Sequence, residues 1–347
     1  MSVSGIIFSN LHDGELPMLT VKRTMGAVPF GGRYRLIDFP LSAMVNAGIS
    51  NIAVIAHHNY QSLMEHIGSG KDWDLARHAG GIRIVPPYSA AYQVREESYD
   101  SRMETLLSIR GMIDRIKEEH ILFADCDVVG TPELKGLIEA HRRGEAPITV
   151  GTEHDGYADE GPSLHIFIVD SAYFKEILFE AEQKAYRSFT EDIVRRQMRR
   201  GMVATYRFEN RFYRMRSLAE YYRLHMLLTG KGGAREELLQ KSNCPIYTRI
   251  LNAPPVKYGS EARVKNALIA DGCMVEGEVI NSVIFRGVHI GKGCSVRNAV
   301  LMENCILAGN ATVDSVVLDK GVSLGSGVAL HGHESMPLFV EEGRKIV

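Results

Sequence analysis

A six-residue repeat in the last third of the chain restricts the fold more than any other feature of the sequence. From about Leu268 onward, apolar side chains recur at every sixth position, beginning with Leu268, Met274 and Ile280, and turn pairs such as Asp271-Gly272 fall between them. This period is typical of hexapeptide β-helices, in which each coil buries its aliphatic side chains against the next coil. We therefore predict a left-handed parallel β-helix over residues 256–347, interrupted where the phase of the repeat slips by four positions.

Residues 1–229 show a different pattern, in which short apolar runs alternate with helical segments. The expected strands are residues 5–8, 51–56, 81–85, 120–124, 148–152 and 165–169. The expected helices are residues 42–47, 60–67, 102–118, 132–143, 190–200 and 212–228. This alternation predicts an α/β domain with a mostly parallel, Rossmann-like sheet, which binds ligands beyond the carboxyl ends of its strands. Residues 230–255, which end near Pro254 and Pro255, are expected to link this domain to the β-helix.

The segment PFGGRYRLIDFPLS (residues 29–42) contains a basic turn and the start of a helix, and it follows the first strand and a loop. Strand, loop, basic turn and helix is the order in which α/β proteins build phosphate sites. A phosphate cradle needs glycines, because backbone N–H groups must close on the anion. The preceding loop, residues 9–25, has one glycine, Gly14, which stands between Asp13 and Glu15. Two carboxylates here would repel a triphosphate, so the chain has the frame of a nucleotide site without its cradle.

One carboxylate stands where a parallel sheet binds its ligands. Asp127, with Asp125 two residues before it, directly follows the expected strand 120–124. An aspartate in this position commonly holds Mg²⁺ beside a nucleotide. Asp127 could equally cap the turn that leads to Pro132, and the pattern alone leaves both interpretations open.

Charge and cysteine content exclude several classes of protein. The formal net charge of −2 implies no polyanion-binding surface, so we expect no nucleic-acid partner. The five cysteines form no CxxC pair, which favours reduced thiols in the cytoplasm over disulfides or a zinc site. The chain begins without a secretory signal and contains no apolar run of membrane-spanning length, so no membrane association is expected.

The two halves together resemble ADP-glucose pyrophosphorylase (glucose-1-phosphate adenylyltransferase). The resemblance rests on AVPFGGRYRLIDFPLS (residues 27–42), HIGSGKDWDLAR (66–77) and GIRIVPPY (81–88) in the first half. In the second half it rests on IADGC (269–273), FRGVHIGKG (285–293) and VLDKGV (317–322). It implies a nucleotidyltransferase domain, followed by the β-helix, that joins ATP and glucose 1-phosphate into ADP-glucose and releases pyrophosphate.

The departures from this family lie where its chemistry takes place. The family's glycine-rich loop is replaced by FSNLHDGEL (residues 8–16), and its Lys-Pro by Met25-Gly26. Its GTADA segment is replaced by SRMET (residues 101–105), although the preceding Tyr99 fits. The hairpin with its sugar-phosphate lysine has no counterpart in residues 152–163. Asp127 aligns with the first metal aspartate, but the second falls at Arg214, which cannot ligate Mg²⁺.

With these losses, the chain resembles the second, GlgD-type subunit of this enzyme family. In that family the subunit modulates a catalytic homologue in glycogen synthesis. The resemblance therefore implies a degenerate catalytic site with a vestigial Asp127, and Mg²⁺ only if some activity remains. It also implies a hetero-oligomer, a tetramer, with a catalytic ADP-glucose pyrophosphorylase subunit.

The resemblance further implies four anion-binding cations between the two domains: Lys22, Arg23, Arg35 and Lys320. Four cations that converge on a cleft would bind a phosphorylated sugar or inorganic phosphate as an effector. The same residues could instead be ordinary solvated or interdomain ion pairs.

Two enzymatic alternatives remain open from the sequence. The first is a weakly active nucleotidyltransferase that relies on Asp127. The second is a hexapeptide-repeat acyltransferase, a class that often uses a histidine of the coil as its base, for which His289, His331 and His333 are candidates. The acyltransferase alternative would leave the first half of the chain without a role.

Overall fold

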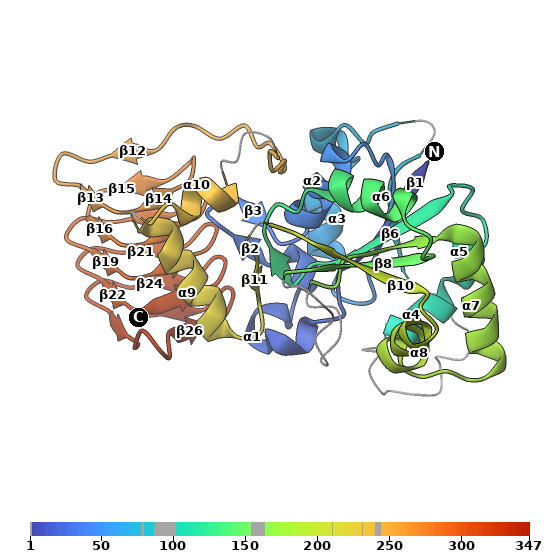
Figure 1. Cartoon of the computed structure of the whole chain (residues 1–347). Coiled ribbons are helices and arrows are strands. Elements are labelled where there is room, and N and C mark those ends of the chain that lie inside the picture. Colours follow the sequence, from blue (N-terminus) through green and yellow to red (C-terminus); the bar gives the residue numbers. More distant parts are fainter. Residues whose placement is uncertain are drawn as a thin grey trace.

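The computed structural model describes residues 2–77, 80–86, 102–153, 164–209, 211–230, 232–239 and 244–347. It places an α/β domain beside a β-helix, as the sequence predicts (Figure 1). Residues 87–101 and 154–163 lie outside the described residues. They include Tyr99 and most of the stretch 152–163, which the sequence comparison set against the family's sugar hairpin.

The α/β domain is built on a seven-stranded sheet with the strand order β10-β8-β9-β6-β1-β4-β5. These strands are β1 (Val3–Phe8), β4 (Asn51–Ile55), β5 (Gly81–Val85), β6 (His120–Asp125), β8 (Ile148–Thr152), β9 (Phe167–Asp170) and β10 (Val203–Arg207). Most neighbours are parallel, but β9 pairs antiparallel with both β6 and β8. Because β1 and β6 are parallel and in register, Phe8 and Asp125 lie side by side at the carboxyl edge of the sheet.

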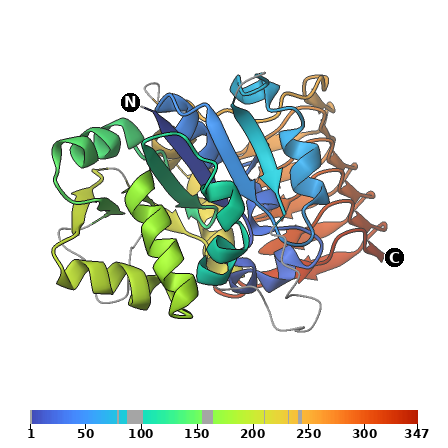
Figure 2. The same cartoon turned by 90° about the vertical axis from the view of Figure 1, so that its right-hand side faces the viewer.

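Helices cover both faces of this sheet (Figure 2). They are α1 (Pro17–Thr20), α2 (Asp38–Asn46), α3 (Gln61–Ile67), α4 (Arg102–Ser108), α5 (Arg110–Ile113), α6 (Leu134–Arg143), α7 (Ser171–Gln183) and α8 (Arg196–Arg199), followed by α9 (Leu218–Thr229) and α10 (Ala234–Leu239). Alternate residues of β1 divide the core: Ile7 packs with α2, α3 and α6, while Ile6 and Phe8 pack with α4 and α7. In the described part of the chain, no helix combines the length and apolar character needed to cross a membrane.

The expected helix 42–47 begins four residues earlier in the structure, at Asp38, and three other predicted helices differ more strongly. The expected helix 102–118 is interrupted after Ser108 and ends at Ile113, and the expected helix 190–200 begins as a π-helix, Phe189–Arg195. The expected helix 212–228 begins only at Leu218, because the Ser217 side chain accepts a hydrogen bond from the Glu220 N–H and caps it there. The preceding Tyr213–Arg214 forms strand β11, which pairs with β7 (Val128–Val129) and carries Arg214 to Asp127.

The β-helix consists of three parallel sheets that form the walls of a prism (Figure 1). The first holds β12 (Lys257–Tyr258), β15 (Met274–Val275), β18 (His289–Ile290), β21 (Ile306–Leu307), β24 (Ser323–Leu324) and β27 (Lys345–Ile346). The second holds β13 (Arg263–Lys265), β16 (Glu278–Ile280), β19 (Ser295–Arg297), β22 (Thr312–Asp314) and β25 (Ala329–His331). The third holds β14 (Leu268–Ile269), β17 (Val283–Ile284), β20 (Val300–Leu301), β23 (Val316–Leu318) and β26 (Leu338–Val340). Met274 and His289 stack 15 residues apart, and residues 289, 306 and 323 stack 17 apart, so every one of these coils is shorter than three hexapeptides and the six-residue phase slips.

One corner of the β-helix is held by a ladder of asparagines. Asn266, Asn281 and Asn298 all adopt positive φ angles of 46–50°, which asparagine tolerates better than most residues. The Asn266 amide donates to Asn281 at 3.1 Å, Asn281 donates to Asn298 at 3.3 Å, and Asn298 donates to Asp314 Oδ1 at 3.0 Å. The corner therefore needs both the backbone tolerance and the side-chain amide of asparagine.

We expect Asn298→Ala to destabilise the β-helix by about 1–3 kcal/mol, because alanine strains a left-handed corner and breaks the ladder. Asn298→Gly keeps the corner and loses only the ladder, so it should cost roughly 1 kcal/mol. Urea unfolding of both variants separates the two effects. Equal stability of Asn298→Ala and the parent chain would contradict this account of the corner.

Helix α9 joins the two domains (Figure 1). Tyr221 Oη donates to the Pro29 carbonyl of the α/β domain at 2.7 Å, and Tyr222 Oη donates to the Asn298 carbonyl of the β-helix at 2.7 Å. Both rings are buried in a core that also contains Phe30 and Phe285. The predicted linker 230–255 contains helix α10, and α9 before it already packs on the β-helix through β17. The domains are therefore joined by a continuous apolar core.

Candidate functional site

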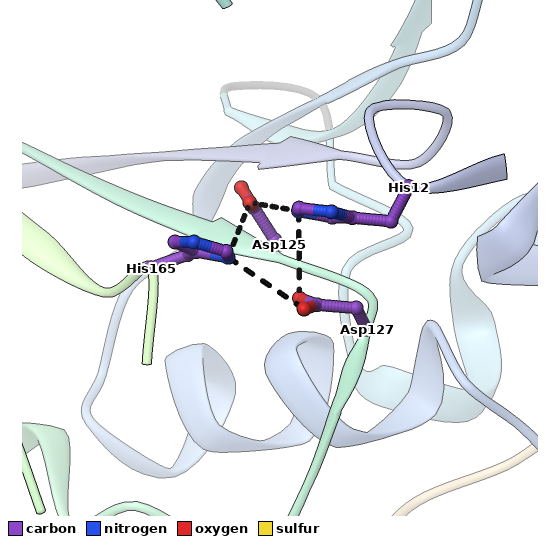
Figure 3. A group of neighbouring side chains, drawn as sticks. All are labelled: His12, Asp125, Asp127 and His165. Atoms are coloured by element: carbon purple, nitrogen blue, oxygen red, sulfur yellow. Dashed lines mark hydrogen bonds and ion pairs between the residues drawn. The ribbon is translucent and has the colours of Figure 1, made fainter. Parts of the chain in front are cut away.

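Four polar side chains converge at the carboxyl edge of the sheet, where the sequence predicted a ligand site (Figure 3). Asp125 ends β6 and Asp127 follows it, while His12 lies in the loop after β1 and His165 lies just before β9. Both aspartate side chains are fully buried, and the two imidazole rings stack with their centroids 4.8 Å apart. The edge thus holds a compact cluster of two carboxylates and two imidazoles.

The loop that would cradle a nucleotide is closed by its own side chains. Asp13 Oδ1 accepts a hydrogen bond from the Met25 N–H at 2.6 Å, and Asp13 Oδ2 accepts one from the Asn10 amide at 2.6 Å. Asn10 Oδ1 in turn accepts from the His57 N–H at 2.7 Å. Asp13 is therefore a buried structural carboxylate of the turn, in the place where the family resemblance implies a glycine.

An arginine neutralises Asp127. Arg214 Nε and Nη2 both lie 3.0 Å from Asp127 Oδ2, and β11 holds the Arg214 backbone beside β7. The Met215 N–H donates to the Asp127 carbonyl at 2.8 Å, which fixes the backbone of both segments together. Arg214, which stands in place of the family's second metal aspartate, thus brings a positive charge to Asp127, which aligns with the first.

Asp125 is neutralised in a similar way. Arg102, in α4, forms an ion pair with Asp125 Oδ2, and its guanidinium lies over the ring of Phe8. Burial raises the pKa of Asp125, but the charge of Arg102 and the hydrogen bonds of His12 and His165 outweigh burial, so the pKa lies well below its usual range. Asp125 is therefore an ionised, buried carboxylate.

His12 links the loop to this cluster. Its Nε2 lies 2.8 Å from Asp125 Oδ2, and its Nδ1 lies 3.2 Å from Glu15 Oε1. Burial lowers the pKa of His12, but the hydrogen bonds with Asp125 and Glu15 and the charge of Asp127 outweigh burial and raise the pKa to about 10. For Asp127, burial is likewise outweighed by His165 and His12, and its pKa is lowered.

The residues at this edge do not fit the Mg²⁺ that the family resemblance implies beside a nucleotide. Mg²⁺ requires near-octahedral oxygen ligands and keeps several waters. Here two of the four candidate ligands are imidazole nitrogens, and Arg102 and Arg214 each hold one oxygen of a carboxylate, which leaves too few oxygen ligands for Mg²⁺. We therefore derive no catalytic step through Mg²⁺ for this chain.

Arg23 and Lys22, two of the four predicted effector-binding cations, differ in their exposure to solvent. Arg23 is 2% exposed, and its Nη1 lies 2.8 Å from Asp319 Oδ1 while its Nη2 lies 2.5 Å from Glu342 Oε2. Lys22 beside it is exposed. Both residues line a groove of about 1070 Å³ between the two domains. Arg23 thus already pairs with two carboxylates of the β-helix.

Of the other two predicted cations, Arg35 lines a smaller cavity between the domains, and Lys320 lies near Glu303, which also lines it. Arg35 donates from Nη1 to Ser62 Oγ at 2.7 Å and lines a cavity of about 130 Å³ together with Glu303. Lys320 Nζ lies 3.8 Å from Glu303 Oε1. Three further arginines line this cavity: Arg33, Arg249 and Arg286. Anion binding by these cations stays a prediction.

The three histidines considered for an acyltransferase lie on the outer surface of the β-helix. His289 is exposed on β18, between Met274 and Ile306 of the neighbouring coils. His331 and His333 line the interdomain groove, and His333 Nδ1 lies 2.8 Å from Ser335 Oγ. Nothing in this arrangement favours a catalytic base over a solvated side chain.

Sequence reasoning missed three residues of the cluster: His12, His165 and Arg102. A signal was present for His12, because it lies in the loop after the first strand, whose carboxyl end faces the site. His165 was placed inside a predicted strand, but the structure leaves it outside β9 with a φ angle of +52°. Arg102 lies within the segment that departs from the family pattern, so only the folded chain links it to Asp125.

Comparison with known proteins agrees with both halves of the fold. A family model of nucleotidyl transferases matches residues 15–160, and a model of the GlmU-like C-terminal hexapeptide matches residues 254–334. The glycogen biosynthesis protein GlgD of Bacillus subtilis is 30% identical over 339 residues, which cover 98% of this chain and 95% of that protein. GlgD of Geobacillus stearothermophilus is 33% identical over 295 residues, or 84% of this chain and 82% of its own length.

The comparison also includes an enzyme whose name states its reaction. The glucose-1-phosphate adenylyltransferase of Clostridium perfringens strain 13 is 29% identical over 333 residues, which cover 87% of this chain and 84% of that enzyme. The resemblance noted in the sequence is therefore confirmed across nearly the whole chain. The chain belongs to the family that comprises the GlgD glycogen biosynthesis proteins and the glucose-1-phosphate adenylyltransferases.

Proposed function

We propose that this chain is a non-catalytic, GlgD-type subunit that regulates or stabilises a catalytic glucose-1-phosphate adenylyltransferase in glycogen biosynthesis. One observation carries the proposal: the Arg214 guanidinium lies on Asp127, the carboxylate that aligns with the metal-binding aspartate. A fixed protein cation at this carboxylate competes with Mg²⁺, and without Mg²⁺ the developing charge on the phosphates has no counter-ion.

The nucleotide loop supports the same proposal. Phosphoryl chemistry depends on positioning and on preorganised positive charge, and removal of one such group typically costs roughly 10²–10³ in rate. In this chain, Asp13 and Glu15 stand where the family carries a glycine and an arginine, and Asp13 is held in place by the Met25 N–H. Because several stabilising groups are missing together, turnover by the isolated chain should be negligible.

The proposed partner is a catalytic homologue in a hetero-oligomer, expected to be a tetramer. Support comes from the intact two-domain scaffold and from the two GlgD relatives, which match 98% and 84% of this chain. The test is to purify the catalytic homologue with and without this chain and to measure co-elution and pyrophosphate release. Co-elution with a changed kcat or KM of the partner is expected, whereas no co-elution and unchanged kinetics would contradict the proposal.

We further propose that the effector anion, inorganic phosphate or a phosphorylated sugar, binds between the two domains. The small cavity there is lined by Arg33, Arg35, Arg249 and Arg286 against one carboxylate, Glu303. Guanidinium groups bind phosphate through paired, charge-assisted hydrogen bonds. Calorimetry with phosphate, sulfate and fructose bisphosphate tests the proposal, and it fails if none of them gives heat or if Arg35→Ala leaves binding unchanged.

Binding of sulfate should weaken as the pH rises through about 8. Desolvation lowers the pKa of Lys320 to about 8, because the charges of Arg35 and Arg23 add to the effect of burial and outweigh the attraction of Glu303. Sulfate keeps its charge between pH 7 and 9.5 and the arginines keep theirs, so loss of the lysine proton should cost roughly tenfold in affinity.

The measurement is sulfate titration calorimetry across this pH range, with Lys320→Arg and Lys320→Met as comparison variants. Lys320→Arg should bind sulfate with high affinity at every pH in this range. Lys320→Met should bind it with low affinity at every pH. An unaltered pH profile in both variants would show that Lys320 takes no part in anion binding.

A further inference from the structure

We propose that His12, Asp125, Asp127 and His165 form a binding site for one divalent transition-metal ion of the Zn²⁺ class. One ligand atom from each of the four side chains lies within 4.8 Å of all the others. The ligands come from three separate segments, the loop after β1, the end of β6 and the segment before β9 (Figure 3). An ion at their centre would tie these segments together at the carboxyl edge of the sheet.

The distances around the cluster place both imidazole nitrogens next to both carboxylates. His12 Nε2 lies 2.8 Å from Asp125 Oδ2 and 3.7 Å from Asp127 Oδ1. His165 Nδ1 lies 3.2 Å from Asp125 Oδ2 and 3.6 Å from Asp127 Oδ2. Tetrahedral bonds of about 2.0–2.1 Å to nitrogen and oxygen place neighbouring ligand atoms about 3.3–3.4 Å apart. Three of these contacts run to the Oδ2 atoms, so a bound ion would take the neighbouring Oδ1 atoms of the two carboxylates together with the two imidazole nitrogens.

Two buried carboxylate oxygens at this site, Asp125 Oδ1 and Asp127 Oδ1, have no hydrogen-bond partner among the described residues, and His165 Nδ1 makes only a poorly aligned contact of 3.2 Å with Asp125 Oδ2. Each aspartate gives its Oδ2 to an arginine, Arg102 or Arg214, and leaves its Oδ1 unpaired in a side chain with 0% exposure. A buried polar atom without a partner is costly and requires an explanation. A bound metal ion would satisfy all three atoms.

The surroundings of the cluster are those of supported metal ligands. Glu15 Oε1 lies 3.2 Å from His12 Nδ1 and accepts a hydrogen bond from it, so an ion would replace only the proton that Nε2 shares with Asp125. A carboxylate behind a ligating histidine is the common arrangement at zinc sites, and ligating carboxylates are also hydrogen-bonded from outside. Arg102 and Arg214 supply those outer contacts here.

The ligand types select the class of metal. Imidazole nitrogen binds Zn²⁺ and its neighbours in the first transition series well, whereas Mg²⁺ prefers oxygen and retains water. The proposed ion has a structural role, because four protein side chains complete a tetrahedral shell and leave no open position for a substrate. This inference is independent of the regulatory function proposed above, and its test measures metal binding without any assay of activity.

The test begins with the purified full-length chain after exhaustive dialysis against a chelator. Addition of Co²⁺ should produce the strong visible absorption of a tetrahedral complex and saturate at one equivalent, and Zn²⁺ should displace it. Because a metal ion displaces protons from its ligands, the titration is performed at mildly alkaline pH. A ten-fold excess of Mg²⁺ should leave the spectrum unchanged.

Variants locate the site. His12→Ala and His165→Ala should each abolish the tetrahedral spectrum, and Glu15→Gln, which only removes the outer partner of His12, should weaken Co²⁺ binding by about 10–100-fold. His120→Ala is the matched control, since His120, His141 and Asp170 form the other group of histidine and aspartate side chains within 4.8 Å in the described chain. That variant should keep full binding.

Two results would overturn the proposal. The first is a chelator-treated parent chain that binds neither Co²⁺ nor Zn²⁺ at one equivalent. The second is tetrahedral binding that persists in both His12→Ala and Glu15→Gln, or that disappears in His120→Ala alone. If His12→Ala or His165→Ala fails to fold, the parent titration and Glu15→Gln still decide the question, because Glu15 remains partly exposed and its loss is expected to be tolerated.

Discussion

Arg23→Ala should destabilise the folded chain by about 3–5 kcal/mol, the usual cost of removing one partner from a buried ion pair. The Arg23 guanidinium lies 2.8 Å from Asp319 and 2.5 Å from Glu342, and the Arg23 and Asp319 side chains are only 3% and 5% exposed. Without Arg23, the Asp319 carboxylate stays buried and uncompensated at the contact between the domains. Thermal and urea unfolding of the parent and the variant measure the effect.

Lys22→Ala is the matched control for this prediction, because Lys22 is the adjacent cation but is exposed. We expect it to change the unfolding free energy by no more than about 0.5 kcal/mol. The pair of variants also separates two roles assigned to Arg23, as an interdomain contact and as an effector ligand. If Arg23→Ala unfolds like the parent chain and only loses sulfate binding, Arg23 belongs to the effector site alone.

Asp127→Asn should destabilise the chain by about 3 kcal/mol. The Asp127 side chain is fully buried and accepts two hydrogen bonds from Arg214, so the substitution leaves that guanidinium without its counter-charge. We place the cost at the lower end of the range for a broken buried pair because Arg214 is one-fifth exposed and can gain water. The same substitution at a catalytic metal ligand would chiefly abolish turnover.

A double-mutant cycle with Arg214→Met tests whether the two residues act as a pair. Asp127→Asn and Arg214→Met together should cost less than the sum of the single changes, with a coupling of about 1–3 kcal/mol. The measurement is urea unfolding of all four chains under one set of metal-free conditions. Strict additivity, or an Asp127→Asn variant as stable as the parent, would contradict the role assigned to the ion pair.

The sequence was sufficient to predict the architecture because each half carries a regular pattern. The six-residue period gave the β-helix, and the bounds of strand Gly81–Val85 and of strand Ile148–Thr152 agree with the prediction to the residue. The ends of helices were less predictable, since Ser217 stops a helical pattern that otherwise extends through Phe212. A capping side chain outweighed periodicity there.

The candidate site could be predicted only in part. The loop chemistry of Asp13 and Glu15 and the position of Asp127 were visible in the sequence, because the carboxyl ends of strands β1 and β6 lie at one edge of the sheet. Arg214 was recognised as a departure from the family pattern, but its contact with Asp127 depends on the short pairing of β11 with β7. Pairing between segments this far apart in the chain leaves no periodic signal.

The central claim is that cations and closed loop contacts have replaced the machinery for turnover, and pyrophosphate release tests it most directly. The purified chain is supplied with ATP, glucose 1-phosphate and Mg²⁺, alone and together with a catalytic homologue. We predict no release above the enzyme-free blank for the chain alone, and release that depends on the homologue in the mixture. Turnover by the chain alone in the ordinary enzyme range of about 1–10³ s⁻¹, abolished by Asp127→Asn, would contradict the claim.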